Sequence, residues 1–363
     1  MFPFIALLAV HFLAVSSTFP TFPDDTSAHI SSYLDSQSLV RYLASSQSRR
    51  HLRDRVKTFH VDSSVKKESN DFSFLAGYPN LEEVYLKRLG VPRISFLASL
   101  TRIRVLDLTG YFGPFDMCAV LPSAETLEVA RLQRLVPNSR QCMTNFRRLK
   151  KLVVFQLDDL STLLGSLEEL EINSSNTNTL EALAALKRLN TLKVLNAPAL
   201  TDSLRGLEAL HATLEELELY AVNLETVAPI GNMSRLCQLN LGSGAVISDL
   251  GSELGRLTQL QHLKIRSYRL PSLAFLVPMG KNLKTLSVSN VHISDLHDFR
   301  NLQNLESLEI VDTLPGIGDI SGMRLLSNLK ELRLFSMTNR FISWQPLSLL
   351  SKLKTLSIYR RWR

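Results

Sequence analysis

The sequence predicts an α/β solenoid, in which short parallel strands stack in one direction, and two observations carry this prediction. The first is an apolar-x-x-apolar-x-apolar cluster that occurs four times between Arg235 and Ile310. Its members are Leu236, Leu239 and Leu241; Leu260, Leu263 and Ile265; Leu283, Leu286 and Val288; and Leu305, Leu308 and Ile310. The second is the spacing, because the clusters begin 24, 23 and 22 residues apart. A repeat of this length is too short to bury its apolar side alone and must pack against neighbouring repeats.

This cluster and its period resemble the leucine-rich repeat. The resemblance implies a horseshoe in which each repeat adds one strand to a parallel concave sheet. Weaker clusters extend the pattern to residues 56–363 and give about 13 to 14 repeats. They are Val56, Phe59 and Val61; Leu81, Val84 and Leu86; Ile103, Leu106 and Leu108; Ala124, Leu127 and Val129; Leu149, Leu152 and Val154; Leu167, Leu170 and Ile172; Leu189, Leu192 and Val194; Leu214, Leu217 and Leu219; Leu329, Leu332 and Leu334; and Leu353, Leu356 and Ile358.

Composition indicates a folded chain. Of its 363 residues, 45% are hydrophobic and 21% charged, which is too apolar for disorder. The formal net charge of +7 weakly favours acidic partners. Cys118, Cys142 and Cys237 are scattered and predict no disulfide framework, which favours a reducing compartment.

Residues 1–17 argue for secretion. An apolar run ends in the small residues Ala14-Val15-Ser16, as at a signal peptidase site, and the run is too short to span a bilayer as a helix. The alternatives are an apolar leader in an intracellular protein and a wrongly assigned start. Asn173-Ser-Ser175 and Asn232-Met-Ser234 are glycosylation sequons that matter only in a secreted chain.

Residues 22–55 change to a helical period and predict two or three short helices. The segment resembles an F-box, and the resemblance implies that it binds the adaptor of a cullin-based ubiquitin ligase. The matching residues are Phe22, Pro23, Ile30, Leu34 and Leu39. The chain departs from the family pattern at Ser45, Ser46 and Arg49, where a valine, a cysteine and a tryptophan are usual. The alternative is a helical cap on the open end of the solenoid.

The connections between strands predict short outer turns. Ile247-Ser-Asp249-Leu250 and Ile317-Gly-Asp319-Ile320 suit a short helix or a single 3₁₀ turn capped by Asp or Ser. Many leucine-rich repeats place an asparagine two residues beyond the cluster, where its side chain bonds neighbouring backbones. Here positions such as Leu132 and Val222 are apolar, which predicts that burial replaces this ladder.

Candidate binding residues follow from strand geometry. Because side chains alternate across a strand, the residues between the leucines face the concave surface. The candidates are Phe155, Glu169, Glu171, Lys193, Leu195, Glu216, Glu218, Tyr220, Lys264, Arg266, Arg333, Phe335 and Tyr359. The aromatic residues suit interface anchors, unless a neighbouring loop folds over them. The glutamates suit either a binding site or an ordinary solvated face.

No motif indicates catalysis, a metal site or a cofactor. His292-Ile-Ser-Asp295-Leu-His297-Asp298 holds four possible ligands, but its apolar positions fit the turn pattern of the other repeats. Gly242-Ser-Gly244 lacks the third glycine of a dinucleotide-binding loop. The basic run 147–151 lacks interleaved aromatic residues, so no nucleic-acid partner is expected.

The leading hypothesis is a non-catalytic protein-binding scaffold, most specifically a cytoplasmic or nuclear substrate receptor of a cullin-type ligase. The rival is a secreted or cell-surface recognition protein with the same concave surface. Adaptor binding through residues 22–55 would favour the first hypothesis, and cleavage near Ser17 the second.

Overall fold

The computed structural model divides the chain into two compact units, residues 1–155 and 156–363. It describes residues 56–61, 72–87, 93–111, 113–156, 165–174, 179–200, 204–222, 224–243, 247–266, 272–289, 296–311, 319–335 and 343–359. The leader, 1–17, and the F-box-like segment, 22–55, lie outside the described residues.

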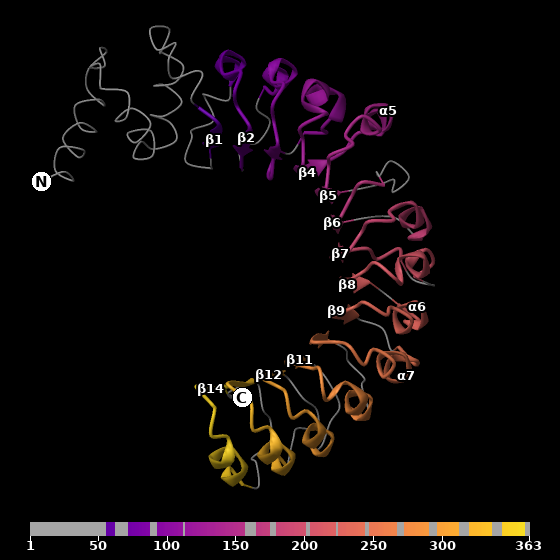
Figure 1. Ribbon diagram of the computed structural model, residues 1–363, viewed down its shortest axis with the longest axis vertical. Coiled ribbons are helices and arrows are strands. Elements are labelled where there is room, and N and C mark those ends of the chain that lie inside the picture. Colours follow the sequence, from indigo (N-terminus) through magenta and orange to yellow (C-terminus); the bar gives the residue numbers. More distant parts are fainter. Residues whose placement is uncertain are drawn as a thin grey trace, which may run out of the picture. The chain divides into compact units, whose positions relative to one another are not determined.

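The described residues contain fourteen strands, which follow one another in the sheet in sequence order (Figure 1). Unit 1 carries β1 (Thr58–Val61), β2 (Glu83–Leu86), β3 (Val105–Asp107), β4 (Val129–Arg134) and most of β5 (Lys151–Gln156). Unit 2 carries β6 (Glu169–Ser174), β7 (Thr191–Val194), β8 (Glu216–Val222), β9 (Gln238–Ser243), β10 (His262–Arg266), β11 (Thr285–Ser289), β12 (Ser307–Val311), β13 (Glu331–Phe335) and β14 (Thr355–Tyr359).

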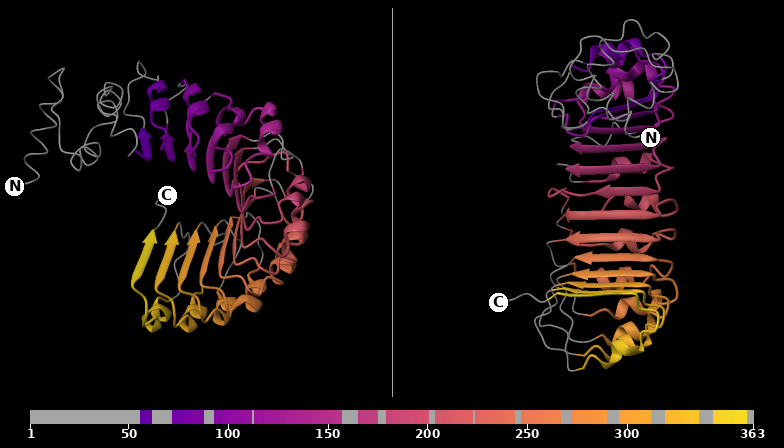
Figure 2. Two further views of the ribbon diagram at one scale, coloured as in Figure 1. Left: turned by 45° about the horizontal axis from the view of Figure 1, so that its top comes forward. Right: turned by 90° about the vertical axis from the view of Figure 1, so that its left-hand side faces the viewer.

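Each strand is followed by a short helical turn where the connection is described. In unit 1 these turns are η2 (Ser73–Gly77), η3 (Ser95–Ser99), η4 (Met117–Ser123), η5 (Pro137–Ser139) and α5 (Arg140–Met143). In unit 2 they are η7 (Glu181–Ala185), η8 (Leu207–Leu210), α6 (Ala228–Gly231), α7 (Leu250–Leu254), η9 (Ala274–Met279), η10 (His297–Asn301), η11 (Ser321–Leu325) and η12 (Gln345–Leu349). The turns cover one side of each unit's sheet and leave the other side open (Figure 2). No helix in the described part of the chain is long and apolar enough to cross a membrane.

The core of unit 2 is a column of leucines at one position of the repeat. Leu239, Leu263, Leu286 and Leu308 are register partners on β9 to β12, and each is at most 2% exposed. Burying a leucine side chain contributes about 1.5 to 3 kcal/mol relative to leaving it in water. The strands are parallel and share one buried column, which confirms the predicted α/β solenoid.

The predicted cluster of β4 was wrong by three residues. The sheet pairs Leu106 with Ala130, so the cluster is Leu127, Ala130 and Leu132, not Ala124, Leu127 and Val129. The central alanine gave a weak apolar signal, although the corrected alignment makes the spacing as regular as elsewhere. Leu132, 3% exposed, is therefore a core residue and not a ladder position.

A ladder of side-chain amides lies on the turns before β11, β12 and β13. The Nδ2 of Asn282 donates to the carbonyl of Thr258 at 2.9 Å, and that of Asn304 to the carbonyl of Lys281 at 2.8 Å. Asn328 repeats the bond one turn further along. These bonds tie consecutive repeats together through backbone acceptors that would otherwise be unpaired.

Aspartates stabilise the outer turns in two different ways. The backbone N–H of Ser321 donates to Asp319 at 2.7 Å, and this bond holds the pKa of that carboxyl below its ordinary value. Asp249 instead accepts from the backbone N–H of Val227 at 3.1 Å, in the preceding repeat. The expected capping is therefore local at Asp319, whereas Asp249 links two repeats.

Cys118 and Cys142 form a disulfide between η4 and α5, with their Cα atoms 5.3 Å apart. The expectation of scattered, unpaired cysteines was wrong for this pair. Their separation of 24 residues equals one repeat, so they stand at equivalent places on neighbouring turns. Cys237 is free and partly buried, and burial raises the pKa of its thiol.

Candidate ligand-binding surface of the second unit

The face of the unit 2 sheet that turns away from the helical turns, here called the inner face, presents three rows of side chains. The first row contains Glu169, Thr191, Glu216, Gln238, His262, Thr285, Ser307, Glu331 and Thr355. The middle row contains Glu171, Lys193, Glu218, Asn240, Lys264, Ser287, Glu309, Arg333 and Ser357. The last row contains Tyr220, Gly242, Arg266, Ser289, Val311, Phe335 and Tyr359.

The acidic end of this face is held together by Lys193. Its Nζ lies 2.7 Å from an oxygen of Glu216 and 3.7 Å from one of Glu218. Partial burial alone would lower the pKa of Lys193. The hydrogen bond to Glu216 and the charges of Glu216, Glu218 and Glu171 outweigh burial and raise this pKa above its ordinary value. Opposite charges on neighbouring strands thus stabilise this end of the face.

Amides complete the bonding of these glutamates. The Nδ2 of Asn240 donates to Glu218 at 2.9 Å, and the Nε2 of Gln238 donates to Glu216 at 2.9 Å. Asn173 donates to Glu171 at 3.2 Å. These acids are thus largely satisfied within unit 2.

Tyr220 and Arg266 meet across the intervening strand. The guanidinium carbon of Arg266 lies 5.5 Å from the centre of the Tyr220 ring. Gly242 is the register partner of both residues, and a Cβ there would come within 2.5 Å of Tyr220 Cδ1. The glycine therefore leaves room for the ring. The repeat spacing in the sequence already places Gly242 between Tyr220 and Arg266, so the strand pattern could have indicated this role.

A second aromatic group lies on β13 and β14. The rings of Phe335 and Tyr359 stack with centroids 5.0 Å apart and planes 6° apart. Tyr359 is 60% exposed, and Phe155, on β5, is 49% exposed. Leu195 is partly exposed after β7. Within the described part of the chain, no loop therefore covers Tyr359 or Phe155, which was the alternative for these residues.

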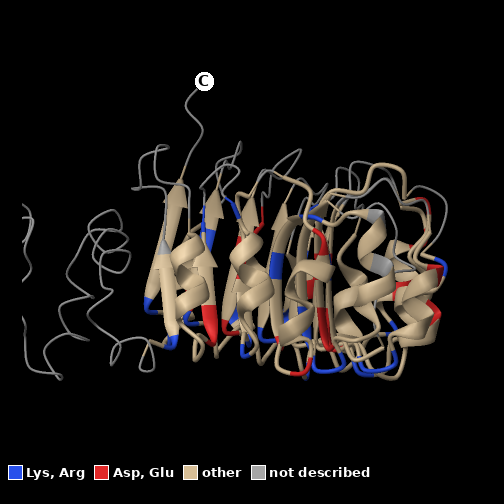
Figure 3. Ribbon diagram, turned by 90° about the horizontal axis from the view of Figure 1, so that it is seen from above, with Lys and Arg blue, Asp and Glu red and all other residues tan. Residues whose placement is uncertain are grey.

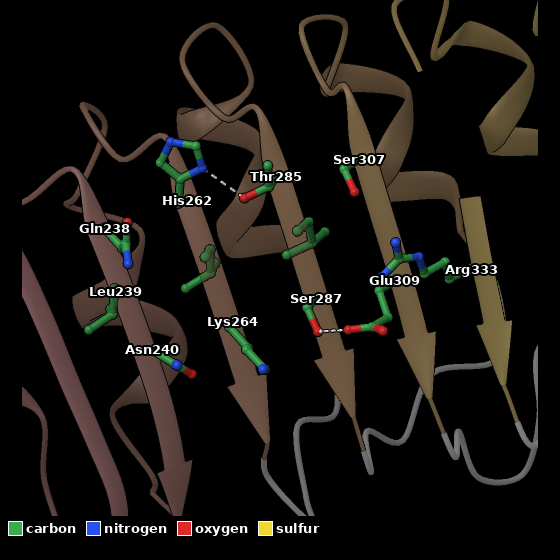
Figure 4. Close-up of a pocket in the computed structure, with 12 residues that line it drawn as sticks. Gln238, Leu239, Asn240, His262, Lys264, Thr285, Ser287, Ser307, Glu309 and Arg333 are labelled. Atoms are coloured by element: carbon green, nitrogen blue, oxygen red, sulfur yellow. Dashed lines mark hydrogen bonds between the residues drawn. The ribbon is translucent and has the colours of Figure 1, made fainter. Parts of the chain in front are cut away.

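A shallow hollow of about 280 Å³ lies on the inner face between β9 and β13 (Figure 4). A hydrogen bond of 2.9 Å joins His262 Nδ1 and Thr285 Oγ1, and Ser287 donates to Glu309 at 2.7 Å. Figure 4 draws both bonds, with Lys264 between Asn240 and Ser287. The hollow is therefore polar, and its lining includes the charged residues Lys264, Glu309 and Arg333.

Most other cations of unit 2 stand away from this hollow. Figure 3 shows many Lys and Arg residues along the edge at which the strands begin. Arg188 lies 3.0 Å from Glu168 there, and Lys330 lies 2.7 Å from Glu306. On the inner face, Arg333 lies 3.5 Å from Glu331. These cations are paired within the chain.

The structure thus brings the predicted inner-face residues of unit 2 into three groups: acids around Lys193, the Tyr220–Arg266 contact, and the Phe335–Tyr359 stack. The residues of the F-box resemblance lie outside the described residues. The described residues contain no group of three or more His, Cys, Asp or Glu side chains placed to hold a metal ion. His297 lies 4.0 Å from Asp319.

Neither a family model nor a curated protein matches the sequence. Solved structures do match. An internalin (inlF) from Listeria monocytogenes is 22% identical with a TM-score of 0.67, and the match covers 87% of this chain and 92% of that one. The Leptospira interrogans leucine-rich repeat protein LIC12759 is 20% identical with a TM-score of 0.51, over 84% and 74% of the two chains.

TLR13, solved as a TLR13–ssRNA13 complex, is 18% identical with a TM-score of 0.58. The match covers 83% of this chain but only 49% of that one, so this chain spans about half the length of TLR13. At such identities the likeness concerns the fold. Together with the parallel strands and their shared leucine column, these matches identify the fold of this chain as a leucine-rich repeat solenoid.

Proposed function

We propose that this chain is a non-catalytic recognition protein that binds a protein ligand on the inner face of unit 2. The observation that carries the proposal is the exposure of aromatic rings, led by Tyr359, on the same face as charged side chains. Desolvated aromatic and arginine side chains dominate the binding energy of protein interfaces. In a monomeric soluble domain such rings would more often be buried.

The proposal places this recognition outside the cytosol. Disulfides persist in oxidising compartments and are rare in the cytosol, so the Cys118–Cys142 bond supports the secreted alternative. The apolar leader 1–17 supports it independently. These two observations reverse the order in which the sequence alone ranked the hypotheses.

Binding is tested by photo-crosslinking from the inner face. A benzophenone amino acid replaces Tyr359, and a matched variant carries it at Leu325, an exposed residue of η11 on the outer side. We expect one defined protein adduct from position 359 and none from position 325. Equal adducts from both positions, or none from either in the native secretion or tissue extract, would contradict the proposal.

The location is tested separately by sequencing the amino terminus of the native protein. Cleavage near Ser17 and resistance of Cys118 and Cys142 to alkylation before reduction are the expected results. An intact leader with freely alkylated cysteines would remove the extracellular assignment.

The cullin-ligase receptor is the second candidate, and only the sequence pattern of residues 22–55 favours it. If it is correct, the adaptor co-purifies with the full chain and is lost when Pro23 and Ile30 are replaced by alanine. Retention of the adaptor by that double variant, or no adaptor with the unaltered chain, would exclude this candidate.

A further inference from the structure

Strand β10 presents three basic side chains on the inner face: His262, Lys264 and Arg266. We call this set the β10 column. Both flanking strands present only uncharged residues there. They are Gln238, Asn240 and Gly242 on β9, and Thr285, Ser287 and Ser289 on β11. The β10 column is therefore a basic stripe between two neutral stripes.

The nearest inner-face acids stand two strands away and are already occupied. Glu218 on β8 accepts from Asn240, and Glu309 on β12 accepts from Ser287. Two strand spacings are about 10 Å, beyond the Debye length of roughly 8 Å at physiological salt. The charge of the β10 column is thus not neutralised by these acids.

Lys264 contrasts with Lys193 in the same row. Lys193 has two carboxylate partners, whereas among the described residues Lys264 has neither an ion pair nor a hydrogen-bond acceptor. Its register neighbours, Asn240 and Ser287, direct their donors to other residues. An ammonium group that lines the hollow therefore lacks a counter-charge.

Asn240, the register neighbour of Lys264 on β9, has a side-chain oxygen without a hydrogen-bond donor among the described residues. Its Nδ2 is committed to Glu218, and its Oδ1 is buried. Buried polar atoms in folded proteins nearly always have a partner. A cation without an acceptor and a buried acceptor without a donor thus stand on adjacent strands. A ligand carboxylate would satisfy the cation, whereas Asn240 Oδ1 is closed off from the surface.

We propose that the β10 column binds an extended acidic segment of the protein ligand, with carboxylates on alternate residues. The proposal rests on the function inferred above. Lys264 and Arg266 are two residues apart on one strand, which is about 7 Å, the spacing of alternate side chains in an extended peptide. One carboxylate meets Lys264, and the next meets Arg266.

Arg266 can take part while it keeps its contact with Tyr220. The contact is a cation–π contact through the guanidinium carbon, which does not use the N–H groups as hydrogen-bond donors, so these groups can donate to a carboxylate. Arg266 is exposed. The tyrosine therefore orients the arginine without occupying its donors.

The test uses a fluorescein-labelled peptide, Gly-Glu-Ala-Glu-Gly, with the full chain at low salt and anisotropy as the readout. We expect saturable binding that weakens as salt rises, and none for the Gly-Gln-Ala-Gln-Gly peptide. Lys264→Ala should weaken binding about tenfold or more, because the variant loses a charge-assisted hydrogen bond to the glutamate. Lys264→Gln, which keeps a long polar side chain, should show the same loss.

The matched control is Lys284→Ala. Lys284 is exposed at the strand-beginning edge, where it donates to Gln261 at 2.8 Å. This variant should bind the glutamate peptide within about twofold of the unaltered chain. Equal losses in the Lys264 and Lys284 variants, equal binding of the glutamine peptide, or no saturable binding would overturn the inference.

Failure here is distinguishable from failure of the proposed function. Crosslinking from position 359 does not depend on Lys264. An adduct at 359 without peptide binding would overturn the acidic-segment inference and leave the recognition function standing. Peptide binding without any adduct would support the inference and count against the 359 end of the surface.

Discussion

Replacing leucines at one position of the repeat should show that the loss of unfolding free energy depends on how deeply each leucine is buried. Leu286 and Leu356 occupy equivalent positions on β11 and β14, but Leu286 is 1% exposed and Leu356 is 49% exposed. Truncation to alanine removes about three carbon atoms. At roughly 0.8 kcal/mol for each buried carbon, Leu286→Ala loses about 2.4 kcal/mol of transfer free energy. The cavity raises the expected loss to about 3 kcal/mol.

Leu356→Ala should lower the free energy of unfolding by only about 1 kcal/mol, because half of its side chain already meets water and, among the described strands, only β13 pairs with β14. Urea unfolding followed by circular dichroism measures both variants, and an unchanged dependence on urea would show that the unfolding unit is the same. Equal losses at the two positions would refute the reasoning that a leucine contributes through neighbours on both sides.

Three further predictions follow from single contacts. Gly242→Ala should displace the ring of Tyr220 and lower the unfolding free energy by about 1 kcal/mol or less, seen as shifted ring resonances in NMR spectra. Replacing Cys118 and Cys142 by serine should destabilise unit 1 by about 3 kcal/mol, and reducing agent should then no longer change its melting temperature. The raised pKa of Lys193 means that its stabilising contribution is complete below about pH 10.5 and is lost as pH rises further. Lys193→Met should therefore weaken the alkaline loss of stability.

The fold was predictable because its signal is repeated. Each leucine cluster is a weak indication alone, but the recurrence from Leu236 to Ile310 fixes strand, register and inner face together. Prediction failed at β4, where Ala130 stands in the central position and an apolar run offered a competing alignment. A small side chain carries little periodic signal, so only the spacing to the neighbouring repeats could have corrected the register.

The sequence predicted which residues lie on the inner face better than it predicted the contacts between them. Alternation along a strand shows that Lys193 and Lys264 share a face, but not that one is paired and the other is not. Lys193 has Glu218 as a register neighbour, whereas the neighbours of Lys264 are uncharged and direct their donors to glutamates on other strands. Likewise, the disulfide could be predicted only by comparing the separation of the two cysteines, 24 residues, with the length of one repeat.

In a solenoid the residues that pack the core differ from the residues that face a ligand, and the β10 column belongs to the second group. Inner-face residues lie outside the leucine column, so packing does not dictate their charge. A face selected only for solubility would gain by placing an acid beside Lys264, as Glu216 and Glu218 stand beside Lys193, because opposite charges on neighbouring strands attract. Asn240 and Ser287 stand there instead. The core does not require this uncompensated charge, and a ligand that carries the missing carboxylate gives a reason for it.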